Sequence, residues 1–285
     1  ILSLGDIRRL SLKKVNVNTP AIKYLNRRFS NIHPNLFNSN LNNKLNDLIE
    51  KKRFDFIITN INSETKIIKI SDLRNQQKYR MTCVIGLGHI GLPLMIHLLN
   101  KINHIIGYDK SKKVINDLKR NKISFHEKNL KSFLKQNLVN KKISFFSDIS
   151  KIKAQNYIVC LGSEINRKKI SNKNLSEIFK KIAKSLNPGD LVILRGTVQV
   201  GLCNKFLIPI LEKNSSLICG KDFNFAFMPE RIIEGDALNE LKTLPQLISG
   251  KSDLCKEKAL NFAKFYFDKI IELSTLEEAE IIKLA

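Results

Sequence analysis

The 285-residue sequence is poor in cysteine, and its cysteines show no short-range pairing. No C-x-x-C occurs, and no spacing resembles a disulfide framework or a cysteine-based metal site. We therefore expect reduced thiols, no metal site and a cytoplasmic location. The chain starts at Ile1, so we expect the natural N-terminus to lie upstream, and no charged-then-apolar signal segment is present. The five cysteines are Cys83, Cys160, Cys203, Cys219 and Cys255.

The sequence also lacks an apolar run that could cross a membrane. The strongest candidate, "CVIGLGHIGLPLMIHLL" over residues 83–99, contains three glycines, a proline and two histidines. A spanning helix needs about 20 predominantly apolar residues with few such interruptions. We therefore expect no membrane association, and the stretch needs another interpretation.

Acidic residues are scarce, with 26 Asp and Glu against 49 Lys and Arg, for a net charge of +23. Residues 1–80 hold 16 basic and 6 acidic side chains, and the remaining residues hold 33 and 20. The excess is spread along the chain, is not interleaved with aromatics and accompanies no nucleic-acid motif. We therefore do not expect nucleic-acid binding, although the charge favours anionic ligands.

The glycines of the apolar stretch have the spacing of a dinucleotide-binding turn. Met81–Ile85 is typical of a buried parallel strand, and Leu92–Leu99 is typical of a helix. Between them lies G-x-G-x-x-G, in which the glycines permit a tight turn, a close approach to a pyrophosphate and close helix–strand packing. The phosphates would face the helix N-terminus. The predicted cofactor contacts in this turn are Gly86, Leu87, Gly88, His89, Ile90 and Gly91.

An acidic residue follows at the end of the next predicted strand. Asp109 ends "IIGYD", 18 residues beyond Gly91. A carboxylate there accepts hydrogen bonds from the ribose hydroxyls and repels a 2′-phosphate, so NAD is favoured over NADP. Nearby Lys110, Lys112 and Lys113 soften that preference.

Strand and helix patterns alternate from residue 81 onward, which predicts a Rossmann-type α/β fold with a doubly wound parallel sheet. Ligands bind at the carboxyl ends of the strands in such sheets. Predicted helices include Leu175–Leu186 and Glu257–Phe265, and a capping box at Ser274–Glu277 opens a last helix. The further predicted strands are Tyr157–Leu161, Leu191–Leu194, Phe225–Met228, Gln246–Ser249 and Ile270–Leu273.

Two glutamates follow one of these strands in "MPERIIEG". Glu230 and Glu234 are four residues apart and could share one helix face. Beside a nicotinamide they could position a sugar and activate water. A Glu pair of this spacing is also common on a solvated helix face, so its context decides between the two interpretations.

That context resembles the NAD-dependent nucleotide-sugar dehydrogenases, which include UDP-glucose 6-dehydrogenase and UDP-N-acetylmannosamine dehydrogenase. The matching text is "VIGLGHIGLPL", "GYDK", "LVILRGTVQVG", "FAFMPERIIEGDALNELKTLPQLISG" and "EEAEIIKLA", which spans the family's N-terminal cofactor domain. The resemblance implies oxidation of a C6 hydroxymethyl to a carboxylate by two NAD in succession. An active-site cysteine would trap the aldehyde as a thioester, which water hydrolyses.

The resemblance also implies roles for individual residues. Glu230 would act as acid or base on the hydrolytic water, and Thr197 would lie beside that water and the cofactor. Glu234 would contact cofactor and substrate, and Lys283 would stabilise the developing oxyanion. Catalytic candidates are thus Glu230, Lys283 and Thr197, with Ser163, Thr197 and Glu234 as further cofactor contacts and Glu230, Arg231, Glu234 and Lys283 as substrate contacts.

The sequence departs from the family pattern in three places. Ser163 and Glu164 stand where the family usually has Thr-Pro, and Gly196 stands where serine is usual. The family's nucleophilic cysteine lies beyond the long central helix, and the sequence stops at Ala285 before reaching it. We therefore expect this chain to bind NAD without completing the oxidation.

Residues 1–80 have a different texture and resemble a partial pair of CBS repeats. Ser3 and Asp6 have the spacing of an adenine-nucleotide contact, whereas the second repeat has Lys69 three residues before Asp72. A strand pair is predicted at residues 55–61 and 66–70. The expected domains are therefore a CBS-like α+β module over 1–80, a Rossmann domain over 81–273, and the start of a central dimerisation helix over 274–285. The two parts could derive from two adjoining coding segments joined at Met81.

One alternative substrate and one alternative class of function stay open. The substrate is expected to be a UDP-N-acetylhexosamine such as UDP-N-acetylmannosamine, because "LRGTV" and "PERIIEG" look closer to those members, with UDP-glucose as the alternative. A non-catalytic NAD-sensing or nucleotide-sensing module has no need for paired glutamates near the nicotinamide. The family's full-length proteins are homodimers, so we expect the same here.

Overall fold

The computed structural model describes residues 56–61, 64–69, 80–166 and 169–284 of the chain. The chain divides into two units between Asn75 and Gln76, and each is described by itself. The first unit contains an antiparallel pair, β1 (Phe56–Ile61) and β2 (Glu64–Lys69), as the sequence predicted. The remaining CBS-like candidates Ser3, Asp6 and Asp72 lie outside the described residues.

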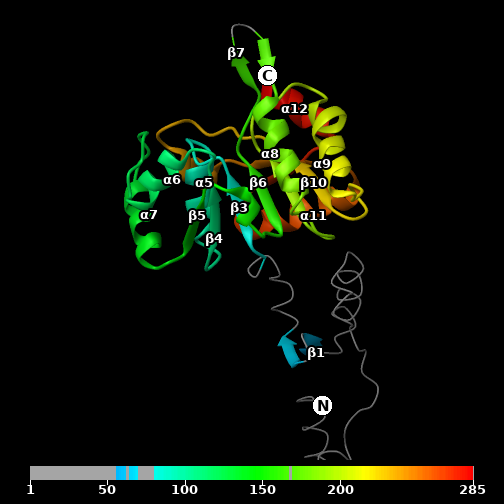
Figure 1. The fold of residues 1–285 in the computed structure, drawn as a ribbon, viewed down its shortest axis with the longest axis horizontal. Helices are drawn as coiled ribbons and strands as arrows, with labels where there is room; N and C mark the ends of the chain where they lie inside the picture. Colours follow the sequence, from blue (N-terminus) through cyan, green and yellow to red (C-terminus); the bar gives the residue numbers. More distant parts are fainter. Residues whose placement is uncertain (1–55, 62–63, 70–79, 167–168, 285) are drawn as a thin grey trace, which may run out of the picture. The chain divides into compact units, whose positions relative to one another are not determined.

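The second unit is built on an eight-stranded sheet with the order β12-β11-β10-β9-β6-β3-β4-β5 (Figure 1). Six neighbouring strands, β5-β4-β3-β6-β9-β10, are parallel to one another. Numbered along the chain from β3, their order is the 3-2-1-4-5-6 of a dinucleotide-binding domain. The chain order reverses beside β3, which places the glycine turn at the switch point of the sheet. The strands are β3 (Thr82–Ile85), β4 (Ile105–Tyr108), β5 (Ile143–Phe146), β6 (Asn156–Val159), β9 (Leu191–Leu194), β10 (Asn224–Phe227), β11 (Gln246–Gly250) and β12 (Ile270–Glu272).

The prediction of an all-parallel sheet is wrong for the last two strands. β11 pairs with β10 antiparallel, with Phe227 opposite Ser249, and β12 is parallel to β11. Only the short helix α10 (Ala237–Thr243) separates β10 from β11, and it packs against α5 (Gly91–Leu98). The chain therefore re-enters the sheet from the edge at which it left, without the longer crossover that a parallel pair requires.

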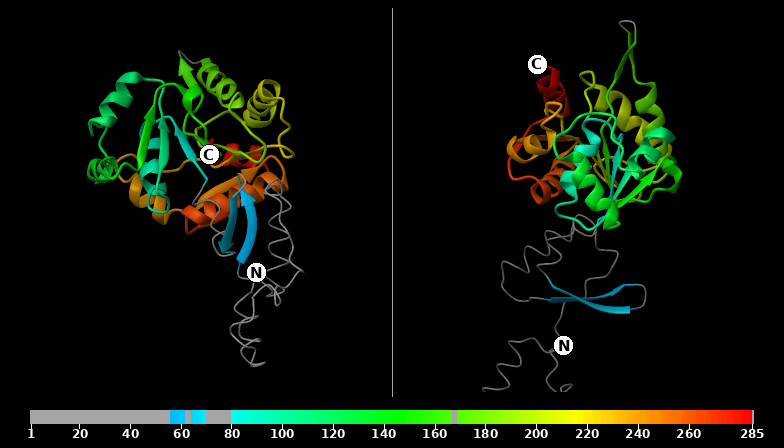
Figure 2. Two further views of the ribbon diagram at one scale, coloured as in Figure 1. Left: turned by 60° about the horizontal axis from the view of Figure 1, so that its bottom comes forward. Right: turned by 90° about the vertical axis from the view of Figure 1, so that its left-hand side faces the viewer.

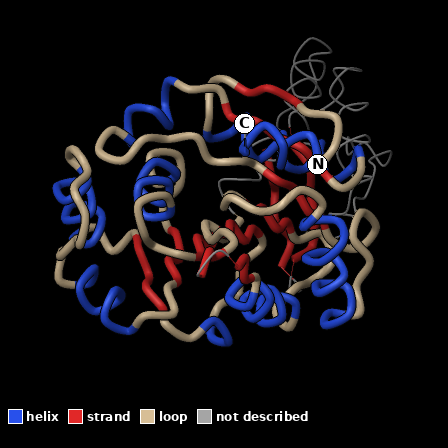
Figure 3. Tube along the Cα trace, turned by 90° about the horizontal axis from the view of Figure 1, so that it is seen from above, coloured by secondary structure: helices blue, strands red, loops and turns tan. Residues whose placement is uncertain are grey.

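Helices cover both faces of this sheet (Figure 3). The central strands are buried along their length, whereas the edge strands β5 and β12 are partly exposed. Alternate side chains enter opposite cores: Cys83 and Ile85 join one, and Val84 joins the other. This explains why the strands are continuous apolar runs. Each buried aliphatic side chain contributes roughly 1.5–3 kcal/mol. The helices that complete these cores include α6 (Lys112–Lys119), α7 (Leu130–Val139), α8 (Lys173–Ala183), α9 (Ile208–Ser215), α11 (Asp253–Tyr266) and α12 (Leu276–Leu284).

The predicted capping box of α12 lies one residue later than expected. The Thr275 hydroxyl accepts a hydrogen bond from the Glu278 amide at 3.0 Å, and the Glu278 carboxylate accepts one from the Ser274 amide at 2.6 Å. Thr275 is therefore the N-cap, and the glutamate of the capping box is Glu278 rather than Glu277.

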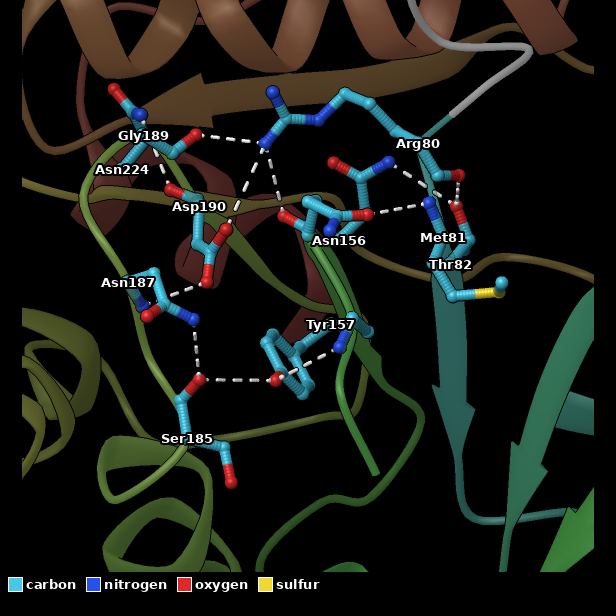
Figure 4. A network of polar contacts seen from close by, with 12 residues as sticks. Arg80, Met81, Thr82, Asn156, Tyr157, Ser185, Asn187, Gly189, Asp190 and Asn224 are labelled. Carbon is cyan, nitrogen blue, oxygen red and sulfur yellow. Dashed lines mark hydrogen bonds and ion pairs between the residues drawn. The ribbon is translucent and has the colours of Figure 1, made fainter. Parts of the chain in front are cut away.

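A polar network closes the amino edge of the sheet where the chain enters β3 (Figure 4). Arg80 donates to the carbonyl oxygens of Gly189 at 2.8 Å and Gln155 at 3.3 Å, and its guanidinium lies 4.0 Å from the Asp190 carboxylate. Asp190 also accepts a hydrogen bond from the Asn187 amide at 2.8 Å. The Arg80 side chain thus ties the start of the described part of this unit to the loops beside β6 and β9.

Asp190 makes the stability of this unit depend on pH. Burial raises the pKa of Asp190 to about 6, despite the opposing effect of Arg80 and the Asn187 amide. The neutral acid is therefore favoured in the fold, and its stabilisation is lost as the pH rises from about 4 through 6. Relative to Asp190→Asn, the wild-type free energy of unfolding should fall by about 3 kcal/mol across that interval. Urea unfolding of both proteins at pH 4 and pH 7 measures this, and parallel pH profiles contradict it.

Candidate functional site

The predicted glycine turn joins β3 to α5 with the expected backbone geometry. Gly86 has φ +89°, and its amide donates to the Tyr108 carbonyl oxygen at 2.8 Å. A Cβ on Gly91 would lie 1.8 Å from the Gly86 carbonyl oxygen, whereas one on Gly88 would meet no atom within 4 Å. Ile90 occupies the N-cap position of α5, and its side chain cannot accept a hydrogen bond from the first amides. The Leu92 amide already donates to the Gly88 carbonyl oxygen at 3.1 Å and Pro93 has no N–H, so the Gly91 amide is the donor of this first turn that is left for a phosphate.

Asp109 lies at this turn, as predicted. Its Oδ2 accepts a hydrogen bond from the Leu87 amide at 3.1 Å, and its Oδ1 accepts one from the Ser111 amide at 2.9 Å. An ionised carboxylate has about four acceptor positions, so two protein donors leave capacity for ribose hydroxyls. The predicted juxtaposition of an acidic group and the glycine turn is confirmed.

The segment Pro229–Gly235 is not helical, so the prediction that Glu230 and Glu234 share a helix face is wrong. Glu230 is 3% exposed, whereas the Glu234 side chain is 61% exposed. The two glutamates differ in burial because the start of the segment stays attached to the end of β9: the Glu230 amide donates to the Arg195 carbonyl oxygen at 3.2 Å. This hydrogen bond keeps the Glu230 side chain in the core. The chain then turns at Gly235, which has φ +100°.

Glu230 is locked in a buried ion pair with Arg195, which is itself fully buried. One carboxylate oxygen accepts from the Arg195 guanidinium, and the other accepts from the Arg231 and Ile232 amides at 2.7 and 2.9 Å. Burial alone would raise the pKa of Glu230, but Arg195 and the two amides hold it below its ordinary value. The group is therefore ionised at neutral pH. Acid or base chemistry at Glu230 would require the loop to turn it away from Arg195.

Glu234 meets the glycine turn directly. Its Oε1 lies 2.9 Å from Nδ1 of His89, and both side chains are at least half exposed. The His89 ring also contacts the Phe125 ring, with 4.2 Å between centroids. Two predicted cofactor residues, separated by 145 positions in the sequence, therefore meet at the carboxyl edge of β3.

Comparison with known protein families agrees with this geometry. Residues 80–266 match the NAD-binding domain of the UDP-glucose/GDP-mannose dehydrogenase family. The chain belongs to this family. This match and the glycine turn confirm NAD as the cofactor and the Rossmann fold as its carrier.

Relatives in the family are nucleotide-sugar dehydrogenases. The chain is 31% identical to UDP-N-acetyl-D-glucosamine 6-dehydrogenase of Salmonella typhi over 206 residues, covering 71% of this chain and 46% of the relative. It is 27% identical to UDP-N-acetyl-D-mannosamine dehydrogenase of Methanococcus vannielii, covering 75% and 48%. The solved structure of UDP-D-ManNAc dehydrogenase from Pyrococcus horikoshii superposes with a TM-score of 0.68 at 25% identity, covering 72% and 49%. The chain thus spans about half the length of these relatives.

The neighbours of Gly196 explain why glycine stands at this position. A Cβ on Gly196 would lie 1.9 Å from the Leu161 carbonyl oxygen, because the loops after β6 and β9 are in direct contact. The Ser163 amide donates to the Thr197 carbonyl oxygen at 2.9 Å across the same contact. The serine that is usual in the family cannot fit this backbone, so Gly196 is required here.

The other departure, Ser163-Glu164, begins a hairpin. Glu164 opens β7 (Glu164–Asn166), which pairs with β8 (Lys169–Ser171), and Figure 2 shows the pair projecting from the domain. Ser163 donates its hydroxyl hydrogen to Asn172 Oδ1 at 2.7 Å. The serine hydroxyl predicted to face the cofactor therefore holds the base of this hairpin.

Lys283 lies half-buried in the last turn of α12. Among the described residues, no hydrogen bond or ion pair joins Lys283 to Glu230 or Thr197, and the ion-pair partner of Glu230 is Arg195. Glu280, one turn earlier, is fully buried and accepts from the Gly201 amide and, at 2.9 Å, from the Cys203 amide. It anchors α12 beside the segment that follows Thr197.

Sequence reasoning missed Arg195 and Glu280. Each is a charged residue inside an otherwise apolar pattern, "VILRG" and "AEII", which was the available signal. The described residues contain no group of three or more His, Cys, Asp and Glu that could hold a metal ion. No helix in the described part of the chain is long and apolar enough to span a membrane.

Proposed function

We propose that this chain is the cofactor-binding part of an NAD-dependent nucleotide-sugar 6-dehydrogenase. The reaction converts the C6 hydroxymethyl of a UDP-sugar into a carboxylate by two successive hydride transfers. The observation that carries the proposal is the Asp109 carboxylate at the Leu87 amide, within the glycine turn. Family membership supports the same reaction class.

The residues of the site fit NAD. The open space over Gly88 admits a pyrophosphate, the Gly91 amide at the start of α5 can bind it, and Asp109 has acceptor capacity for the adenosine ribose. When bound, NAD accepts hydride from the substrate carbon. The exposed Thr197 at the end of β9 and Glu234 above the turn flank the path along which the cofactor would extend.

The sugar-handling residues are proposed from the same segment. Arg231 and Glu234 are exposed on the Pro229–Gly235 loop and can reach a substrate, and Lys283 would stabilise an oxyanion. Glu230 would act on the hydrolytic water after leaving Arg195. The substrate class is a UDP-N-acetylhexosamine, since the relatives named above act on UDP-N-acetylglucosamine and UDP-N-acetylmannosamine.

We further propose a cytoplasmic homodimer. All five cysteines are free thiols, which suits a reducing compartment. α12 exposes Ile281 (52%), Ile282 (38%) and Leu284 (54%), an apolar surface suited to a second subunit. An adenine nucleotide at Ser3 and Asp6 stays a prediction.

Titration of the chain with NADH tests the proposed function. Wild-type protein should bind NADH and bind NADPH more weakly, because a 2′-phosphate meets the Asp109 carboxylate. Asp109→Ala should lose about tenfold or more in NADH affinity, roughly 1.4 kcal/mol, and should narrow the gap to NADPH. Asp253→Ala, at a fully exposed side chain on α11, is the control and should bind as wild type. A folded wild-type chain without NADH affinity overturns the proposal.

A further inference from the structure

Glu127 is a buried acidic residue outside the predicted site. It is 8% exposed, and it has no ion-pair partner among the residues that the structure describes. Its Oε2 accepts a hydrogen bond from the Gly235 amide at 3.0 Å, and its Oε1 accepts one from the Leu238 amide at 3.4 Å. A buried carboxylate is costly unless donors satisfy it, so these two amides account for its position.

Both amides belong to the turn that leads from the Pro229–Gly235 loop into α10. Gly235 is in the left-handed region, and Leu238 is the second residue of the helix. Amides in a first helical turn have no partner within the helix, and a carboxylate is favoured beside them. The Lys128 amide also donates to the Gly235 carbonyl oxygen at 3.5 Å. Glu127 and Lys128 therefore hold Gly235 through both its N–H and its C=O.

The same segment contacts the cofactor turn. Glu234, which precedes Gly235, lies 2.9 Å from His89, and the Phe125 ring packs on the His89 ring. Because Glu234 and Gly235 share a peptide bond, freeing Gly235 also frees the backbone that carries the Glu234 carboxylate. The segment from Phe125 to Lys128 thus contacts His89 in the glycine turn through Phe125, and Gly235 in the loop through Glu127 and Lys128.

We propose that Glu127 is a positioning residue for cofactor binding. It acts through Gly235, whose fixed amide sets where the Glu234 carboxylate lies above the glycine turn. Glu127 itself contacts neither cofactor nor substrate in this role. The inference rests on the proposed function, in which Glu234 contacts NAD and the nucleotide sugar.

Two variants of Glu127 and one control test the inference. Glu127→Ala removes both acceptors, Glu127→Gln keeps the volume and one acceptor oxygen, and Glu177→Ala changes an exposed glutamate on α8. In Glu127→Ala we expect amide hydrogen exchange at Gly235 and Leu238 to rise about tenfold, and NADH affinity to fall about tenfold. Glu127→Gln should be intermediate in both, and the control should match wild type.

A double-mutant comparison separates positioning from a general structural role. With Glu234→Gln already present, Glu127→Ala should lower NADH affinity by less than about twofold, because the contact that it positions is gone. An additive loss in the double variant overturns the inference, as does unchanged NADH affinity in Glu127→Ala. If that variant does not fold, Glu127→Gln decides by the same criterion. Absence of NADH binding by folded wild type overturns the proposed function instead, and this inference with it.

Discussion

Arg195→Ala should lower the free energy of unfolding of the Rossmann unit by about 3–5 kcal/mol. The substitution leaves the Glu230 carboxylate buried without its cation, because that side chain is only 3% exposed and faces the core. It also removes the hydrogen bond from Arg195 to Gln246 Oε1 at 3.0 Å and the contact with the Phe267 ring, 6.0 Å from its centroid. Urea unfolding at pH 7 measures the loss.

The matched control removes both charges. Arg195→Met combined with Glu230→Gln should recover most of the lost stability, since no uncompensated charge stays buried. The Arg195–Glu230 ion pair also predicts a pH effect. Because the pKa of Glu230 is lowered in the fold, the ionised group stabilises the folded state at pH values above the ordinary carboxyl pKa. This stabilisation is lost as the pH falls through the folded-state pKa. A cost below about 1 kcal/mol in Arg195→Ala, or the same acid sensitivity with and without Arg195, contradicts the ion pair as described.

Gly91→Ala should abolish NADH binding and destabilise the fold. Its Cβ would lie 1.8 Å from the Gly86 carbonyl oxygen and 3.3 Å from the Cys160 Cβ, and the first of these neighbours is backbone that cannot rotate away. The turn must therefore open, which moves the amide of residue 91 and the start of α5 away from any phosphate. We expect a loss of at least about 100-fold in NADH affinity and of about 2 kcal/mol or more in stability. Calorimetric titration and thermal melting measure the two effects.

Gly88→Ala is the control that separates ligand from fold. An added Cβ meets nothing within 4 Å, so stability should stay within about 0.5 kcal/mol of wild type. NADH affinity should nevertheless fall about tenfold, because the methyl group occupies the space that the pyrophosphate would enter. Wild-type affinity in this variant would show that the diphosphate does not approach the turn at Gly88.

The strands and the cofactor turn could be predicted because their signals are local. Leu191–Leu194 was predicted to the residue, since a strand buried on both faces is a continuous apolar run. β6 and β10 begin and end one or two residues from their predicted bounds, because apolar residues such as Leu161 and Met228 continue past the last ladder pair. Asp109 was placed by the fixed length of a strand–turn–helix–strand unit.

The hairpin β7–β8 and the reversed strand β11 could not be predicted in the same way. The five residues of β11 do not indicate whether the strand runs parallel or antiparallel to β10, because either direction buries the same apolar side chains. The direction follows from the path of residues 228–245 and from the packing of α10 on α5. The position of Gly196 is similar, since its requirement comes from Leu161, which lies on a different strand end.

Short-range patterns therefore suffice for the family, the sheet and the acid at the glycine turn, because each depends on spacing within one supersecondary unit. The state of each glutamate does not follow from such patterns. Glu230 and Glu234 are four residues apart in a motif that looks symmetrical, yet one pairs with Arg195 in the core and the other meets His89 at the surface. Their partners lie 35 and 145 positions away, and folding alone brings them into contact.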